Sequence, residues 1–191
     1  MEPLDALSRS RQEFEDRLRQ IGDDQWNLST PCTKWSVGDL VNHMLLGTRM
    51  SVQLLAGGSQ EDVMAGLGDD IVGTSTDVVG DFVALADQMH EGFAAPGGLD
   101  GIVDHPMGTI PRTMFIGFRI GDNGVHAWDL ARAIGADEQL DADLVRFIWD
   151  GFEPTASGLV QSGLFGDGSS KNVSDDAPLQ TRLLDLLGRR P

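Results

Sequence analysis

Apolar residues recur at spacings of three, four and seven along several segments of this 191-residue chain, and glycine or proline interrupts the segments. This spacing places apolar side chains on one face of an α-helix, whereas a half-buried strand would show strict alternation. Several long helices with few strand signals predict an all-α fold, an α-helical bundle with extra short helices. The expected helices cover residues 3–21, 36–56, 77–94, 111–135, 141–164 and 178–187.

The segments between these helices predict loops and one ambiguous stretch. Residues 59–76 are rich in glycine, aspartate and threonine and are expected to form a loop. Residues 99–110 place apolar residues around a central proline and glycine, which fits either a small hairpin or a loop. Pro154 is expected to kink or end its helix. The length and 40% apolar content suit one domain over residues 1–191, with a bundle core of about 1–165 and a C-terminal extension of about 166–191.

The net negative charge of the chain argues against some classes of binding partner. The chain carries 30 acidic against 14 basic side chains, a formal charge of −16. Such a surface repels phosphate backbones and anionic lipids, so neither a nucleic acid nor a membrane is expected as a partner. No apolar run approaches the roughly 20 residues of a membrane-spanning helix, and the acidic opening is unlike a secretory leader. With a single cysteine, Cys32, excluding an internal disulfide, we expect a soluble cytoplasmic protein.

Three residues carry the candidate chemistry: His43 in the second expected helix, and Asp122 with His126 in the fourth. The i,i+4 spacing puts Asp122 and His126 one turn apart on the same side of their helix. One imidazole from a neighbouring helix would complete three ligands for a divalent metal and leave a coordination position open, as catalytic sites require. His43 is expected on an inward-facing apolar stripe, where its ring needs a partner. A metal, a carboxylate or a backbone carbonyl would each serve.

Other polar residues near these motifs each have two interpretations. Arg119 shares the face of Asp122 and is the candidate catalytic residue, either pairing with that carboxylate or binding an anionic substrate. Asp39 is expected to cap its helix, the alternative being a carboxylate that supports a ligand. Cys32 is either a buried residue that only packs in the core, or a redox or ligand residue. The second role is open because a helix N-terminus lowers a thiol pKa. His105 is either structural or part of the access to the site.

The opposite face of the fourth helix carries three glycines, Gly117, Gly121 and Gly124. A glycine inside a helix costs roughly 1 kcal/mol relative to alanine, so three on one face indicate close approach by another element. We expect another helix, or the second subunit of a homodimer, to pack against this face.

Two stretches resemble the metal motifs of the mycothiol-dependent maleylpyruvate isomerase-like proteins, an actinobacterial branch of the DinB-like metalloenzymes. The first stretch is Thr30-Pro31-Cys32-Thr33-Lys34-Trp35-Ser36-Val37, followed by Asp39-Leu40-Val41-Asn42-His43. The second is His126-Ala127-Trp128-Asp129-Leu130-Ala131-Arg132-Ala133-Ile134-Gly135. The C-terminal Gly188-Arg189-Arg190-Pro191 also fits, and the resemblance spans nearly the whole chain.

This resemblance implies a DinB-like four-helix bundle that holds a divalent metal, zinc or else nickel, on His43, Asp122 and His126. The isomerase pattern has glutamate at the middle position, so Asp122 is one methylene shorter. The resemblance also implies an enzyme that uses a low-molecular-weight thiol, mycothiol, on a small-molecule substrate, as an isomerase or a transferase. Two alternatives stay open: hydrolysis by metal-activated water, and a non-catalytic metal-binding protein with a stress or binding role.

Overall fold

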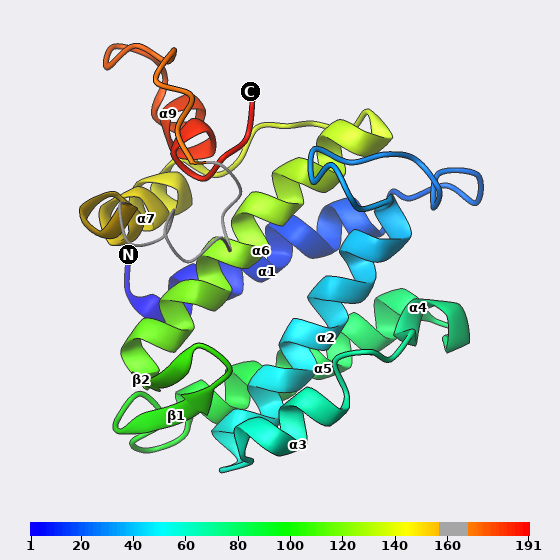
Figure 1. Ribbon diagram of the computed structural model, residues 1–191, viewed down its shortest axis with the longest axis vertical. Coiled ribbons are helices and arrows are strands. Elements are labelled where there is room, and N and C mark those ends of the chain that lie inside the picture. Colours follow the sequence, from blue (N-terminus) through cyan, green and yellow to red (C-terminus); the bar gives the residue numbers. More distant parts are fainter. Residues whose placement is uncertain (157–167) are drawn as a thin grey trace.

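The computed structural model, which describes residues 1–156 and 168–191, is built around four long helices (Figure 1). They are α1 (Pro3–Leu18), α2 (Val37–Leu55), α5 (Val78–Ala94) and α6 (Arg112–Ile134). Helix α6 packs against α1 and α2, and α5 packs against the same two helices. Helices α2 and α6 are far apart in the sequence but adjacent in space, so both can contribute to one site.

The expected all-α bundle is confirmed, and its core consists of the residues that set the helical periodicity. The largest fully buried side chains come from all four long helices and include Leu7, Phe14, Leu40, Met44, Phe82, Met89, Phe115 and Trp128. Gly135 ends α6 with a φ of 73°, a left-handed conformation that glycine adopts without strain. Pro111 precedes α6 as its N-cap residue rather than opening its first turn.

Shorter elements surround the bundle. They are α3 (Gln60–Ala65), α4 (Ile71–Thr74), β1 (Ile102–His105), β2 (Gly108–Pro111), α7 (Ala142–Phe152), the 3₁₀ turn η1 (Glu153–Thr155) and α9 (Leu179–Leu186). Strands β1 and β2 pair antiparallel, so the ambiguous stretch forms a hairpin. Helix α9 packs against α7, which in turn contacts α6 and α1.

The prediction of a continuous loop over residues 59–76 is wrong, because this segment contains the short helices α3 and α4. Ser59 and Asp62 form a capping box at the start of α3. The side chain of Asp70 accepts a hydrogen bond from the backbone N of Gly73 at the start of α4. Polar residues that suggest a loop by composition act here as helix caps.

The fifth expected helix divides at Pro154. Helix α7 ends at Phe152 and is followed by η1, which contains the proline. A proline in a helix interior removes a backbone hydrogen bond, so a short 3₁₀ turn at this position is the expected outcome. The predicted continuation of this helix to Leu164 falls outside the described residues. The expected last helix is confirmed as α9.

Helix α7 covers two of the three glycines on the bare face of α6. A Cβ at Gly121 would lie 2.6 Å from the ring of Phe152, and a Cβ at Gly124 would lie 2.7 Å from Ile148. A Cβ at Gly117 would meet nothing within 4 Å in the described part of the chain. Another helix therefore packs against this face, as predicted, while the homodimer stays a prediction.

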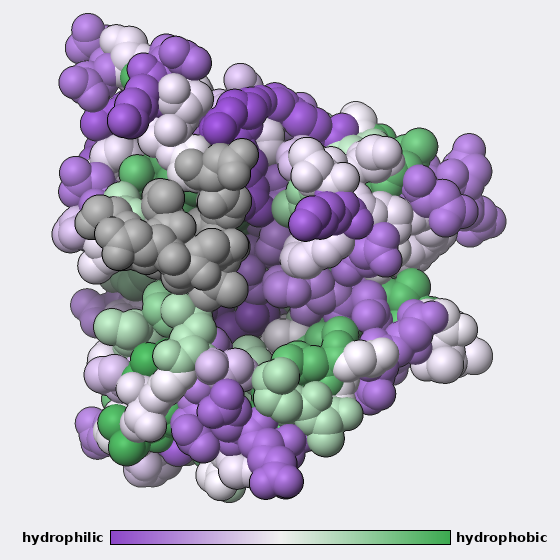
Figure 2. All heavy atoms as spheres, viewed as in Figure 1, coloured by the Kyte–Doolittle hydropathy of each residue, from purple (hydrophilic) through white to green (hydrophobic). Residues whose placement is uncertain are grey.

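Figure 2 shows the face on which α2 and α6 lie side by side. Hydrophilic side chains gather in a hollow near its centre, over the region between these two helices. None of the helices in the described ranges combines the length and the hydropathy needed to cross a membrane.

Candidate metal centre

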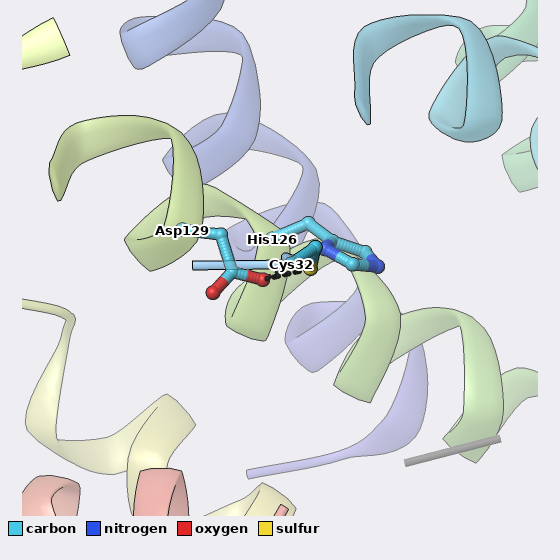
Figure 3. Close-up of side chains that lie close together, drawn as sticks. All are labelled: Cys32, His126 and Asp129. Carbon is cyan, nitrogen blue, oxygen red and sulfur yellow. Dashed lines mark hydrogen bonds and ion pairs between the residues drawn. The ribbon is translucent and has the colours of Figure 1, made fainter. Parts of the chain in front are cut away.

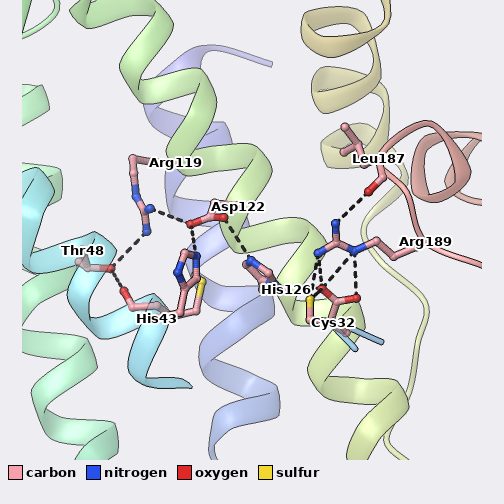
Figure 4. Close-up of polar contacts among 10 residues, drawn as sticks. Cys32, His43, Thr48, Arg119, Asp122, His126, Leu187 and Arg189 are labelled. Carbon is pink, nitrogen blue, oxygen red and sulfur yellow. Dashed lines mark hydrogen bonds and ion pairs between the residues drawn. The ribbon is translucent and has the colours of Figure 1, made fainter. Parts of the chain in front are cut away.

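Three side chains converge where α2 lies against α6 (Figure 4). His43 Nε2 lies 3.5 Å from Asp122 Oδ2, and His126 Nε2 lies 3.3 Å from Asp122 Oδ1. One candidate ligand atom from each residue lies within 4.8 Å of the other two. The fold thus brings together the three residues that the sequence singles out as metal ligands.

This donor set suits a divalent cation such as zinc. Two donors that bind zinc at 2.0–2.1 Å in a tetrahedral arrangement are about 3.4 Å apart, close to the 3.3 Å between His126 Nε2 and Asp122 Oδ1. The side chains of His43 and Asp122 are 37% and 23% exposed, whereas that of His126 is 7% exposed. A cation held by this group would be reached from the side of His43 and Asp122. Three protein ligands would leave one position for a substrate.

The start of α2 fixes the position of His43 along the helix. Ser36 Oγ accepts a hydrogen bond from the backbone N of Asp39, and Asp39 Oδ2 accepts one from the backbone N of Ser36. This capping box satisfies two amide groups that the first helical turn leaves free. The structure therefore supports the capping role predicted for Asp39.

The expected burial of His43 among apolar residues is only half right. The core face of α2 carries Leu40, Met44 and Leu45, which are fully buried, while His43 is half-buried at the edge of that face. The prediction placed His43 on one stripe with Leu46, Met50 and Leu54. Leu54 is buried, but Leu46 and Met50 are only partly buried. The buried face of α2 is rotated about the helix axis relative to the predicted stripe, so the His43 ring lies at the boundary of the bundle.

The ring of Trp35 forms a wall beside both histidines. Its centroid lies 4.6 Å from that of His43 and 5.8 Å from that of His126. The turn before α2 holds Trp35 in place, because Thr30 Oγ1 donates a hydrogen bond to the Trp35 carbonyl and the Trp35 amide donates one to the Cys32 carbonyl. Trp35 thereby shields one side of the imidazoles from water.

Arg119 binds the middle member of the group. Its Nη1 donates to Asp122 Oδ2 at 2.7 Å, and its side chain is 5% exposed. The guanidinium also reaches Thr48 Oγ1 at 3.5 Å. A Cβ at Gly47 would lie 2.8 Å from Arg119 Nη1, so the glycine makes room for this arginine. Arg119 engages Oδ2, whereas Oδ1 faces His126 Nε2.

Asp129 supports His126 from behind. His126 Nδ1 lies 2.9 Å from Asp129 Oδ2, and the Asp129 side chain is 0% exposed. A carboxylate accepts a hydrogen bond but cannot donate one, so His126 Nδ1 carries the proton of this bond. Nε2 is then the nitrogen available to a metal, an arrangement common among metal-binding histidines.

Arg189, next to the C-terminus, pairs with Asp129. Its Nη2 lies 2.6 Å from Asp129 Oδ2, and its Nε donates to Oδ1 at 3.1 Å. Cys32 lies against the same pair, with its Sγ 3.4 Å from Asp129 Oδ2 and 3.4 Å from Arg189 Nη2. Figure 3 shows Cys32, His126 and Asp129 close together, and Figure 4 adds Arg189.

The neighbouring charges and hydrogen bonds shift the pKa values of His126 and Asp122 so that the charged form of each side chain is favoured. Burial alone would lower the pKa of His126, but its hydrogen bond to Asp122, the charge of Asp122 and hydrogen bonds to Asp129 and Cys32 raise it well above 6.5. Burial alone would raise the pKa of Asp122, but the charges of Arg119 and His43 and the hydrogen bond to His126 hold it well below 3.8. A metal must therefore displace a proton from His126 to bind there.

The supporting pair is also ionised. Burial would raise the pKa of Asp129, but hydrogen bonds to His126 and Arg189 and the charge of Arg189 lower it from 3.8 to about 2. Burial would lower the pKa of Arg189, yet the hydrogen bond and charge of Asp129 raise it above its ordinary value. A buried carboxylate and a buried guanidinium thus neutralise each other beneath His126.

Cys32, His126 and Asp129 form a second group whose potential ligand atoms lie within 4.8 Å of one another. The Arg189 guanidinium already contacts both the Cys32 sulfur and the Asp129 carboxylate. A metal at this position would have to displace this cation, whereas the His43, Asp122 and His126 group keeps His43 and Asp122 partly exposed. The latter group is the better candidate for a metal.

His105 lies apart from the three converging residues. Its ring packs against Phe115 and Phe118, and its Nδ1 accepts a hydrogen bond from the backbone N of Met107. Burial, with a smaller contribution from the charge of Arg119, lowers the pKa of His105. These contacts favour the structural interpretation of this histidine.

Two residues of the site were not assigned a role from the sequence alone: Asp129 behind His126, and Arg189 behind Asp129. Asp129 follows His126 at an i,i+3 spacing, which is a usable signal for a supporting carboxylate. No spacing rule links Arg189 to Asp129, because the contact joins residues 60 positions apart.

The all-α bundle with its two small strands defines a DinB-like fold. The chain belongs to the family described as "Mycothiol maleylpyruvate isomerase N-terminal domain", which matches residues 7–131. This stretch includes His43, Asp122, His126 and Asp129 but not Arg189.

Two similar proteins come from Mycobacterium tuberculosis. They are "Uncharacterized protein MT0763" of strain CDC 1551 / Oshkosh and "Uncharacterized protein Rv0738" of strain H37Rv. Each is 34% identical over 178 residues, which cover 93% of this chain and 89% of the relative. No solved structure gave a significant match.

Proposed function

We propose that this protein is a divalent-metal-dependent enzyme that uses a low-molecular-weight thiol to isomerise or transfer a group on a small molecule. The observation that carries the proposal is the convergence of His43, Asp122 and His126 at the junction of α2 and α6, with two of the three side chains partly exposed. The family description supplies the thiol, mycothiol, and the isomerase precedent. The fold by itself fixes neither substrate nor reaction.

The residues present fit a resident metal. Two imidazoles and one carboxylate suit zinc, and nickel accepts the same imidazole ligands. His43 Nε2, His126 Nε2 and Asp122 Oδ1 are the atoms that would hold it. A bound divalent metal would deprotonate a coordinated thiol and so supply a nucleophilic thiolate at neutral pH.

The surrounding residues orient this group. Asp129 accepts the hydrogen bond of His126 Nδ1 and so presents Nε2 toward Asp122. Arg119 holds Asp122 through Oδ2 and, being 5% exposed, acts on substrate only through that carboxylate in the described arrangement. The predicted role of Arg119 in binding a substrate anion would require it to leave Asp122. Trp35 limits the approach of water.

Metal content tests the first half of the proposal. We expect purified wild-type protein to hold about one divalent ion, and His43→Ala and His126→Ala to lose it, because each removes one of only three ligands. His90→Ala, on α5, is the matched control and should keep the metal. Wild-type protein that binds neither zinc nor nickel would overturn the metal-dependent function.

Thiol dependence tests the second half. Metal-loaded protein should convert an electrophilic small molecule, with maleylpyruvate as the first substrate to try, only when mycothiol is present. Turnover without any thiol would favour hydrolysis by metal-activated water instead. Metal bound tightly, with no turnover of either kind, would favour the non-catalytic binding role.

A further inference from the structure

We propose that Arg189 is a positioning residue for the candidate metal centre: it fixes the carboxylate of Asp129, which in turn orients His126. The inference rests on the proposed function in so far as His126 binds a metal. It concerns a residue outside the stretch that matches the family, since the match ends at residue 131. A segment beyond the matched domain would thus complete the support of a metal ligand inside it.

The tail that carries Arg189 is anchored at several points. Leu183, Leu184 and Leu187 of the α9 segment are buried in the core. The amide of Arg189 donates to the Leu184 carbonyl at 2.8 Å. Arg132, on α6, donates to the Arg190 carbonyl at 3.0 Å. The backbone around Arg189 is therefore held against α6.

The guanidinium makes contacts on several sides. Nη2 reaches Asp129 Oδ2, Nε reaches Asp129 Oδ1, and Nη1 donates to the Leu187 carbonyl at 2.9 Å. The side chain is 11% exposed, and its partner carboxylate is 0% exposed. A paired contact of this kind uses the planar fork of arginine, which a lysine ammonium cannot reproduce.

This contact determines which way the Asp129 carboxylate faces. Oδ1 is bonded by Arg189, whereas Oδ2 is shared among Arg189, His126 Nδ1 and Cys32 Sγ. With both oxygens engaged, the carboxylate cannot rotate without losing a hydrogen bond in a buried setting. Removing Arg189 would leave the buried Asp129 carboxylate without its guanidinium partner, so that only His126 and Cys32 would contact it. His126 would then lose its fixed orientation.

Zinc affinity of the full-length protein tests the inference, with three variants. Arg189→Met removes the guanidinium and keeps much of its volume, and Arg189→Lys keeps the charge without the fork. Arg190→Met is the matched control, because Arg190 carries the same charge on the adjacent, more exposed residue and does not contact Asp129. Competition against a zinc chelator gives the dissociation constants, and thermal unfolding reports on the fold of each variant.

We expect Arg189→Met to weaken zinc binding about tenfold, the lower end of the effect for lost outer-shell partners. Arg189→Lys should fall between Arg189→Met and wild type, and Arg190→Met should stay within about twofold of wild type. Equal zinc affinity in wild type and Arg189→Met would overturn the inference. So would an equal loss in Arg189→Met and Arg190→Met, because that result would reflect general disruption of the tail.

A second measurement does not depend on metal. The Nδ1 proton of His126 can be followed by NMR in ¹⁵N-histidine-labelled, metal-free protein, and its bond to Asp129 should protect it from exchange with water. Faster exchange in Arg189→Met, but not in Arg190→Met, would support the positioning role even if wild-type protein failed to bind zinc. Unchanged exchange in Arg189→Met would overturn it, whatever the fate of the proposed function.

Discussion

Arg119 Nη1 lies 2.7 Å from Asp122 Oδ2, inside a space that exists because residue 47 on the facing helix has no side chain. The arginine and the carboxylate occupy adjacent turns of α6, and α2 closes over them. The orientation of Asp122 thus depends on a glycine that contacts neither the metal group nor the carboxylate.

Gly47→Ala should therefore disturb the site from a distance. The new Cβ would lie 2.8 Å from Arg119 Nη1 and force the guanidinium to move. We expect a loss of roughly 1–3 kcal/mol in the free energy of unfolding, as for other overpacked interiors, together with weaker metal binding. Urea denaturation and a metal titration measure the two effects. Gly38→Ala, on the same helix with only an ordinary contact at 3.4 Å, is the control and should show neither.

The glycine face of α6 predicts two substitutions of opposite sign. Gly121→Ala should destabilise the fold by roughly 1–3 kcal/mol, because its Cβ would lie 2.6 Å from the Phe152 ring. Gly117→Ala meets nothing within 4 Å in the described chain, so it should stabilise the helix by about 1 kcal/mol. Chemical denaturation of both variants is the test. If both variants were less stable than wild type, the prediction for Gly117 would be wrong, and if both were more stable, the prediction for Gly121 would be wrong.

Metal affinity should depend on pH through His126. Its pKa is raised well above 6.5, because after the opposing effect of burial the contacts with Asp122, Asp129 and Cys32 dominate. The protonated ring must lose its proton before Nε2 can bind a metal, so apparent affinity should fall about tenfold per pH unit below that raised value. The decline would then start at a higher pH than an unperturbed histidine would give. Zinc titrations between pH 6 and 9 measure it, and a flat profile over that range would contradict the prediction.

The free energy of unfolding of the metal-free protein should decrease at low pH, because the Asp129 carboxylate becomes protonated there. A carboxyl group whose pKa is lowered in the fold contributes its stability above the unfolded pKa and loses it as pH falls through the folded pKa. Here the folded pKa is about 2 against an ordinary 3.8, so about 2 kcal/mol should be lost between roughly pH 4 and pH 2. Urea unfolding at a series of pH values gives the slope. Asp129→Asn should be less stable near neutral pH and show a shallower acid slope, with the remainder arising from Asp122, whose pKa is also lowered.

Structural features that depend on residues close together in the sequence could be predicted from the sequence alone. Helical periodicity predicted the four long helices, and the Ser36 and Asp39 pair predicted the start of α2. The i,i+4 spacing placed Asp122 and His126 on one face, and the structure brings them together with His43. The sequence was less informative about α3 and α4, because their capping residues have the composition of a loop.

Long-range contacts were beyond local rules. The rotation of the core face of α2, which leaves His43 at its edge, depends on how α5 and α6 pack against it. The pairing of Arg189 with Asp129 depends on where α9 packs against the rest of the protein. The sequence predicts this short helix but not its position in the fold. Such contacts follow from tertiary packing rather than from any spacing along the chain.

The separation of 60 residues between Asp129 and Arg189 also has a consequence for how the protein matures. During translation the ribosome adds His126 and Asp129 well before Arg189, so the nascent bundle contains its candidate ligands while the buried carboxylate beneath them still lacks its counter-charge. The orientation that we propose Arg189 gives to His126 would therefore be completed only after α9 has packed against α7.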